Sequence, residues 1–423
     1  MLNYAMNKKH FIIFIILVVA LLIFNNLLHN MYLKLASSPV GLQTNVNTEY
    51  IDSQKLFNKA WKVIKNNYYD TDMNEQDWYR WKAHYQGKIK TDEDAYVAIN
   101  TMLESLNDPY SKFMSKTEFA ELNTSIDSKI TGIGVNIFSN SGKITIFNVI
   151  EGTPASNAGI KAYDVIFAVN KKEVSGMSIS DVAGLVRGPE NSIVEVTILR
   201  DNKKIIKNIK RKEIKIKTVK SNVDKNIGYI QILSFIGLST TNEFLDALEK
   251  TEKTKGLILD LRGNPGGLLP NAVFIANLFI PQGNIVSIVG RNGYKRNMTA
   301  QNVDYTVEKP MVVLIDKSSA SASEILSGAL KDYHKAKLVG TTTYGKGMVQ
   351  EVLTLPNETG MNLTIAKYLT PNGNDINKKG IAPDVQIALT QQDLKKNNDA
   401  QLEVAKNMLQ DMIKKEEEEK VQK

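Results

Sequence analysis

The sequence predicts a multidomain α+β protein, because three regions of different character follow one another along its 423 residues. That length favours about two or three domains over a single small core. Helical periodicity comes first, short β-branched runs between Gly and Asn turns come next, and apolar strands alternating with helices follow. A helical region, a β-rich module and an α/β core are therefore expected in this order.

Composition excludes several classes of protein. The net charge of +8 is moderate, and lysines are interspersed with acids, so a solvated surface is favoured over a nucleic-acid interface. The absence of cysteine excludes disulfides, thiol nucleophiles and thiolate metal sites. Four histidines without an HExxH motif argue against a dedicated zinc site. No cofactor is expected.

An apolar run near the N-terminus predicts export. Lys8 and Lys9 precede Phe11–Phe24, and two leucines shortly beyond extend this run to nearly the ~18 residues of a membrane span. Ala36-Ser37-Ser38 fits a cleavage site, but Pro39 follows it. An uncleaved single-pass anchor with its N-terminus inside is therefore favoured over a cleaved signal and secretion. In both cases the remaining chain works outside the cytoplasm.

The predicted elements follow these patterns. Helices are expected between residues 52 and about 122, and the turn at Asn107-Asp108-Pro109 ends one of them. The β-rich module is expected to have strands at 134–138, 144–149, 165–169 and 193–199 and one helix at 180–186. The core is expected to have strands at 227–233, 256–261, 311–315 and 336–339 with helices at 241–249, 270–278 and 322–334. Such apolar strands indicate a sheet buried on both faces. The chain then ends in a charged helix from 391, with a frayed, solvated Glu416–Glu419.

The first chemical candidate is Ser321, in a serine-rich turn between a predicted strand and helix. Such a junction exposes a hydroxyl and aims helix N-terminal amides at an oxyanion formed beside it. The alternative is structural, because Ser321-x-x-Glu324 also fits a capping box.

The second candidate is Lys346, which lies between Gly345 and Gly347. These glycines let the backbone bend tightly around the lysine. A P-loop is also suggested by the spacing from Gly340, but Gly347 replaces its Ser or Thr and a strand follows instead of a helix. Lys346 is thus a candidate base.

No histidine is a good base for Ser321. His334 follows about three turns of helix, which places it roughly 20 Å from the helix start, and His84 lies in the remote helical region. Lysine works near pH 7 only if its pKa falls by about three units from 10.4, which burial without a carboxylate partner provides. No acid lies within four residues of Lys346, and Gln350 offers a neutral partner.

A third candidate is the turn Asp260–Gly267, whose Gly266-Gly267 pair follows an apolar strand. A glycine turn there offers free backbone amides, as an oxyanion hole requires. A plain structural turn explains the same residues equally well.

These motifs together resemble the C-terminal processing peptidase family, also called tail-specific proteases, over about residues 52–390. The motifs that carry the resemblance are Asn107–Ser111, Gly132–Val135, Thr153–Ala155, Ala158–Ile160, Asp164–Ile166, Arg187–Pro189, Asp260–Gly267, Ser319–Glu324, Gly345–Gly347 with Gln350, and Gly380–Asp384. One small departure is Gly263, where many relatives have a polar residue.

The resemblance implies a role for each site residue. Ser321 is the implied nucleophile, Lys346 the general base and Gln350 its orienting partner. Backbone amides of Gly266 or Gly267 and of Ala322 are the implied oxyanion donors.

The sequence pattern predicts an anchor and flank at 1–36, a linker at 37–51 and a charged helix at 391–423. For the chain between them, the resemblance implies helices at 52–117, a PDZ domain at 118–213 and a ClpP- or crotonase-like protease core at 214–390. In the PDZ domain, Gly132, Ile133, Gly134 and Val135 would bind apolar C-terminal tails of protein substrates, and Arg187 would couple tail binding to activation.

The implied protein is a serine endopeptidase that acts through an acyl-enzyme, forms a homodimer and works with a possible activating adaptor protein. The alternative is a membrane-tethered PDZ adaptor whose protease-like core is not catalytic.

Overall fold

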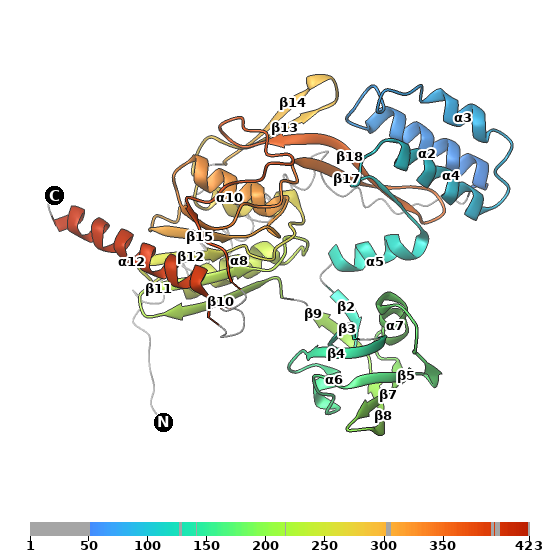
Figure 1. Ribbon diagram of the computed structural model, residues 1–423, viewed down its shortest axis with the longest axis horizontal. Helices are drawn as coiled ribbons and strands as arrows, with labels where there is room; N and C mark the ends of the chain where they lie inside the picture. The colour runs from blue at the N-terminus through green and yellow to red at the C-terminus, as the bar shows by residue number, and fades with distance from the viewer. Residues whose placement is uncertain are drawn as a thin grey trace, which may run out of the picture. The chain divides into compact units, whose positions relative to one another are not determined.

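The computed structural model describes residues 51–126, 129–140, 142–215, 217–301, 306–390, 393 and 398–421. The predicted anchor and almost all of the predicted linker lie outside these residues. The chain forms two compact units, one made of residues 121–217 with 237–239 and the other of the remaining chain (Figure 1). Within the described residues, no helix combines the length and apolar character that a membrane span requires.

The larger unit contains a six-stranded sheet in the order β10-β11-β12-β15-β16-β19. All neighbouring pairs are parallel except β10 with β11. Its strands are β10 (Val219–Asp224), β11 (Ile227–Ile232), β12 (Gly256–Asp260), β15 (Met311–Ile315), β16 (Lys337–Gly340) and β19 (Val385–Gln386). Four of these strands were predicted from the sequence.

Both faces of this sheet are buried, as the apolar strands predicted. Leu257 and Leu259 of β12 pack with α8 (Thr240–Lys250), α9 (Leu269–Asn277) and α10 (Ala322–Asp332), whereas Ile258 packs on the other face with α12 (Ala400–Val421). Successive side chains of a strand point to opposite faces, so both sets must be apolar.

The C-terminal helix α12 is part of this core. Its buried residues Ala405, Leu409 and Ile413 pack against the sheet. The expectation of a frayed end at Glu416–Glu419 was wrong: the helix continues to Val421, and Glu416 and Glu417 form ion pairs with Lys420 and Lys255. A helix can continue through several exposed glutamates when a lysine one turn away offsets the repulsion between their charges.

A second, antiparallel sheet carries the helical region. Its path is β1-β18-β13-β14, and β17 also pairs with β18. The helices are α2 (Ser53–Asn67), α3 (Tyr79–Tyr85) and α4 (Asp92–Ser105), and the strands are β1 (Lys112–Met114), β13 (Asn284–Gly290), β14 (Lys295–Thr299), β17 (Met348–Thr354) and β18 (Gly360–Leu369). Leu56 and Ile99 of the helices share one hydrophobic cluster with Leu363 of β18. The sequence predicted β17 but not β18.

The smaller unit is the β-rich module. Its main sheet has the order β3-β4-β5-β7-β8, with β6 paired to β5, and β2 pairs with β9. The elements of the unit are β2 (Lys129–Gly132), β3 (Val135–Asn140), β4 (Lys143–Val149), α6 (Pro154–Asn157), β5 (Val165–Val169), β6 (Lys172–Glu173), α7 (Ile179–Val186), β7 (Ile193–Arg200), β8 (Lys203–Lys210) and β9 (Lys212–Lys215), and α5 (Lys116–Ile126) leads into it. The four predicted strands and the predicted helix all form.

Candidate active site and tail-binding groove

Three loops meet at the carboxyl edge of the parallel sheet. Asp260 pairs with Leu314 between β12 and β15, and Ile315 pairs with Gly340 between β15 and β16. The three strands therefore end side by side. The loops that follow them carry Gly266, Ser321 and Lys346, respectively. Sites in parallel α/β sheets form at this edge, so the topology brings together residues that are far apart in the sequence.

Ser321 lies in a strained turn at the start of α10. Its backbone dihedrals are φ 54° and ψ −113°, a combination that non-glycine residues rarely adopt and that costs about 1–3 kcal/mol. The turn is held against the Gly-Gly loop, because a Cβ atom on Gly266 would lie only 2.8 Å from the Cβ of Ser321. Gly266 itself has φ +100°. Glycine at this position permits the close approach.

The serines on either side of Ser321 are structural. Ser319 and Ser323 are fully buried. The Ser319 hydroxyl donates to the Leu261 carbonyl at 2.8 Å, and the Ser323 hydroxyl donates to the Asn264 carbonyl at 3.0 Å. Ser321, in contrast, is only partly buried. These bonds tie the serine loop to the Asp260–Gly267 turn and leave Ser321 as the accessible hydroxyl of the three.

Glu324 joins the Ser321 and Lys346 loops, although its side chain is fully buried. Its Oε2 accepts hydrogen bonds from the amides of Ser321 at 2.8 Å and Lys346 at 2.9 Å. Its Oε1 accepts from the Thr343 hydroxyl at 2.6 Å and the Gly345 amide at 2.7 Å. The sequence identified Glu324 only as half of a capping box, and a link to residues 343–346 leaves no signal at short sequence range.

The Lys346 side chain is half-buried. Burial lowers the pKa of its amine below the ordinary value, although the charges of Asp108 and Glu324 act in the opposite direction. The expectation of a site without carboxylates was therefore wrong, because folding brings in two acids that are remote in sequence. Desolvation still has the larger effect, so the predicted direction of the shift is found.

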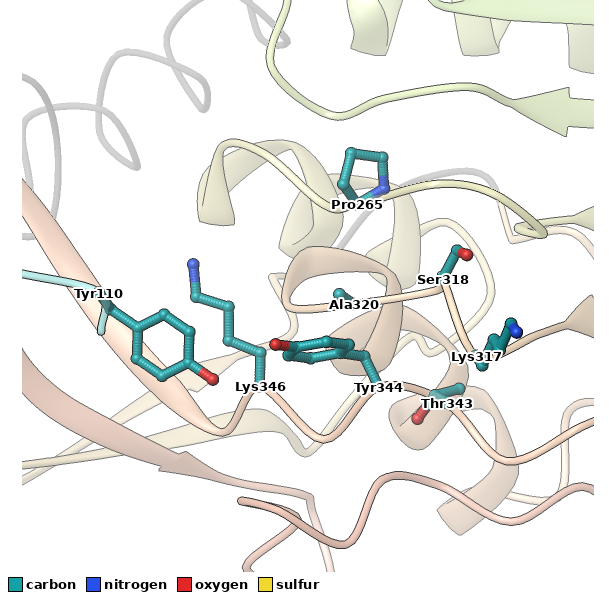
Figure 2. A pocket seen from close by; sticks show the side chains of 8 residues that line it. All are labelled: Tyr110, Pro265, Lys317, Ser318, Ala320, Thr343, Tyr344 and Lys346. Carbon is teal, nitrogen blue, oxygen red and sulfur yellow. The ribbon is translucent and has the colours of Figure 1, made fainter. Parts of the chain in front are cut away.

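Tyr110 forms part of the Lys346 environment. The Lys346 Nζ lies 4.9 Å from the centre of the Tyr110 ring. Figure 2 shows the two side chains next to each other, with the Tyr344 phenol on the other side of the lysine. The sequence placed Tyr110 in a family motif but gave it no role.

An open pocket of about 690 Å³ lies in front of these groups. Its lining side chains are shown in Figure 2 and are Tyr110, Pro265, Lys317, Ser318, Ala320, Thr343, Tyr344 and Lys346. The lining comes from the loops after β12, β15 and β16 and from the turn after α4. An extended polypeptide has room to enter such an open pocket.

Gln350 is hydrogen-bonded to the neighbouring strand. It lies on β17, and its Nε2 donates to the Thr364 Oγ1 on β18 at 3.3 Å; no hydrogen bond joins it to Lys346 among the described residues. A strand directs Gln350 across the sheet towards its paired neighbour. Its implied role as orienting partner stays a prediction.

Of the implied oxyanion donors, two amides remain available. The Gly266 N–H donates to the Asn264 Oδ1 at 2.9 Å, so it is already engaged. Ala322 is the first residue of α10, where amides have no partner within the helix. The Phe235 amide donates to the Gly266 carbonyl, which precedes Gly267. The Gly267 N–H itself takes part in no described hydrogen bond. Gly267 and Ala322 are therefore the better candidates.

The smaller unit contains a groove of about 210 Å³ that brings the other predicted residues together. Gly132, Ile133, Gly134, Val135 and Arg187 all line it. Further lining comes from Asn136, Ile137, Ile150, Ile179, Ala183, Val186 and Ile214. The groove thus lies between β3, the first strand of the sheet order, and helix α7. An exposed strand edge beside an apolar groove suits the addition of an extended peptide.

No cluster of three or more His, Cys, Asp or Glu side chains suited to a metal ion occurs in the described part of the chain.

Three family models match the chain. They are peptidase family S41 over residues 226–387, the PDZ domain over residues 145–200 and the Tricorn protease C1 domain over residues 52–97. The S41 match spans the loops that carry Gly266, Ser321 and Lys346. The protein is thus a serine-type peptidase of mixed α/β fold with an S41 core and a PDZ domain.

Named relatives define the family further. The carboxy-terminal processing protease CtpA of Bacillus subtilis is 40% identical over 78% of this chain and 68% of its own length. The carboxyl-terminal-processing protease of Synechocystis is 33% identical over 79% of this chain and 81% of its own length. Among solved structures, the photosystem II D1 C-terminal processing protease has a TM-score of 0.56 at 32% identity and covers 80% of this chain and 94% of that chain. The chain belongs to the carboxyl-terminal processing protease family. These relatives give no support to the alternative of a non-catalytic adaptor.

Proposed function

We propose that this processing peptidase is an exported, membrane-tethered endopeptidase that cleaves by a Ser–Lys mechanism. The observation that carries the proposal is the common anchoring of Ser321 and Lys346 on Glu324, beside the Gly266-Gly267 turn. Lys346 and Ala320, the residue before Ser321, line the open pocket. A strained serine and a desolvated lysine whose backbone amides are held by one carboxylate suit nucleophilic catalysis.

In the proposed mechanism, the Ser321 Oγ attacks the scissile carbonyl carbon while its proton passes to the neutral Lys346 amine. The amides of Gly267 and Ala322, and Gly266 if its bond to Asn264 opens, stabilise the oxyanion. The tetrahedral intermediate then expels the leaving amine, which takes the proton from Lys346, and an acyl-enzyme remains. Water, deprotonated by the same lysine, hydrolyses the ester and restores Ser321. Gln350 is proposed to orient the amine.

The groove of the PDZ domain is proposed to bind the C-terminal tail of the substrate. Amides around Gly132–Gly134 would hold the terminal carboxylate, and Ile150, Ile179 and Val186 would receive apolar side chains. Arg187 at the end of α7 is proposed to couple tail binding to activation as a ligand-driven population shift.

Location and assembly rest on the sequence. Lys8, Lys9 and the run Phe11–Phe24 favour a single-pass anchor with an extracytoplasmic catalytic domain. Proposed partners are exported or membrane proteins with accessible apolar C-terminal tails, an activating adaptor protein and a second copy of the chain.

The decisive experiment compares two versions of a largely unfolded test protein, one with an apolar and one with a charged C-terminal tail. The detergent-solubilised full chain is expected to degrade the apolar version faster, and Ser321→Ala is expected to abolish degradation while still binding the tail. Retained cleavage by Ser321→Ala would remove this serine from the mechanism.

A further inference from the structure

The turn Asn107–Ser111, which follows α4, is built into the site by a continuous series of hydrogen bonds. The Asp108 Oδ1 accepts from the Tyr110 amide at 3.0 Å, and its Oδ2 accepts from the Ser111 hydroxyl at 2.6 Å. The Ser111 Oγ in turn accepts from the Thr364 amide of β18 at 3.0 Å. The turn is therefore fixed to the antiparallel sheet rather than free at the surface.

The other end of this series is Gln350. Its Nε2 donates to the Thr364 Oγ1, so Gln350 reaches the turn through Thr364 and Ser111. The turn places the Tyr110 ring 4.9 Å from the Lys346 Nζ. This series of contacts therefore connects Gln350 to the turn whose Tyr110 ring faces the lysine side chain.

The Tyr110 and Tyr344 side chains line the same pocket, and Figure 2 shows their two hydroxyls directed towards each other. Tyr344 is 58% exposed, whereas Tyr110 is less exposed and its ring lies 4.9 Å from the Lys346 Nζ.

We propose that Tyr110 is a positioning residue for Lys346: its ring shields one side of the amine from water and directs it into the pocket. This inference rests on the proposed role of Lys346 as the base. It makes the helical region a contributor to the active site, because the turn after α4 supplies the shielding ring.

The charged and titratable groups around the amine come from several elements. Asp108 lies on the same turn as Tyr110, Glu324 on α10, Tyr344 on the lysine's own loop, and Lys317 on the turn after β15 that lines the same pocket. The two carboxylates favour the charged amine and desolvation favours the neutral one. The ring has two opposing effects, since its face attracts an ammonium group while its bulk excludes water. Exclusion of water by the ring is the larger of the two effects in this arrangement.

The test measures the titration of Lys346 directly, without proteolysis. The full chain is trace-labelled with acetic anhydride across a pH series, and acetylation of the Lys346 and Lys317 peptides is quantified by mass spectrometry. Tyr110→Ala is expected to raise the labelling midpoint of Lys346 by roughly one pH unit and to leave that of Lys317 in place. Tyr110→Phe keeps the ring and is expected to retain the wild-type midpoint.

Matched controls separate this effect from general damage. Tyr79→Ala removes a 57% exposed ring from the same helical region and is expected to leave the Lys346 midpoint unchanged. Tyr110→Leu, which keeps apolar bulk, serves if Tyr110→Ala does not fold, and it is expected to give a smaller rise. In active protein, the acid limb of kcat/KM is expected to move with the labelling midpoint.

An unchanged or lowered Lys346 midpoint in Tyr110→Ala, or in Tyr110→Leu where the alanine variant does not fold, would overturn the proposal. Because labelling does not require cleavage, this outcome differs from a failure of the proposed function, in which Lys346→Ala would retain activity.

Discussion

The main-chain amides of Ser321 and Lys346 donate to the same oxygen atom, Oε2 of the buried Glu324, at 2.8 and 2.9 Å. The loop after β15 and the loop after β16 are therefore connected through this one oxygen atom by two hydrogen bonds. The bonds use backbone groups and leave both side chains free for chemistry. A charged acceptor makes each of these bonds stronger than a neutral one would be.

Glu324→Gln is expected to damage both stability and activity. The substituted amide presents an NH₂ donor to backbone donors, so at least one of the four bonds is lost and a buried group is left unpaired. The expected loss is about 3 kcal/mol in the free energy of unfolding. A shift of the serine turn by a fraction of an ångström is expected to reduce cleavage roughly a hundredfold.

Urea unfolding and a fluorogenic peptide assay measure these two losses. Glu249→Gln, at an exposed position on α8, is the matched control and should change neither quantity. Wild-type cleavage by Glu324→Gln would show that the shared oxygen does not set the catalytic geometry.

Activity is expected to rise with pH as Lys346 loses its proton. Burial lowers the pKa of this amine, so the acid limb of kcat/KM should have its midpoint below the ordinary value of about 10.4. A pH profile of kcat/KM measured with one peptide, from about pH 5 to about the ordinary lysine pKa, locates this midpoint. A profile that falls with rising pH would argue against a neutral lysine base.

The same pKa shift predicts how stability depends on pH. Between the lowered pKa of folded Lys346 and the ordinary pKa of the unfolded chain, the unfolded state binds more protons, so stability rises with pH. Lys346→Met removes the free-energy cost of burying a charged amine in the folded state. Its gain in melting temperature over the wild type should be larger at neutral pH than near pH 10 (roughly the ordinary lysine pKa). Lys378→Met is the control, and its melting temperature is compared with that of the wild type at the same two pH values. An equal gain in the melting temperature of Lys346→Met at both pH values would contradict the lowered pKa of Lys346.

Ala183→Trp is expected to block tail binding to the PDZ domain. Ala183 lines the groove, and an indole there would fill the space that an apolar tail residue requires. Fluorescence polarisation with a labelled apolar peptide should show affinity reduced roughly tenfold or more. Ile206→Trp adds an indole at a position that is 62% exposed and outside the groove. Equal binding by both variants would place the tail elsewhere.

Arg262 connects the Gly-Gly turn to the C-terminal helix. Its guanidinium donates to Asp260 at the end of β12 and to both carboxylate oxygens of Asp399, at 2.7 and 2.8 Å. Asp399 also accepts from the Leu402 amide in the first turn of α12. Asp399→Ala is therefore expected to loosen α12 and cost about 2 kcal/mol of unfolding free energy.

Asp411→Ala, at an exposed position on the same helix, is the control for this variant in thermal unfolding. Burial alone would raise the pKa of Asp399, but hydrogen bonds from Arg262 and Leu402 lower it overall. Its contribution to stability is thus present above the ordinary carboxyl pKa and is lost as pH falls through the lowered value. The difference between wild type and Asp399→Ala should therefore shrink in acid, and a constant difference would mean that the ion pair contributes little.

The sequence by itself determined the order of the elements and the family. Apolar strands such as 311–315 can be predicted because both of their faces are buried. Turn motifs such as Gly345-Lys346-Gly347 can be predicted because local backbone geometry restricts the residue types. Ser321 and Lys346 could be selected in this way, since each lies on a short motif next to a predicted strand. The long strand β18 was missed, because its pairing with β1, β13 and β17 depends on partners distributed along the chain.

Only the tertiary structure decided what surrounds these residues. Strand order at one edge of the sheet brings the buried Glu324 to the amides of both loops, and packing of the helices on β18 brings Tyr110 to the lysine. It also directs Gln350 to Thr364 rather than to Lys346. Hydrogen bonds and desolvation act over a few ångströms in space whatever the separation in sequence. The electrostatic environment of the lysine therefore exists only once the chain has folded.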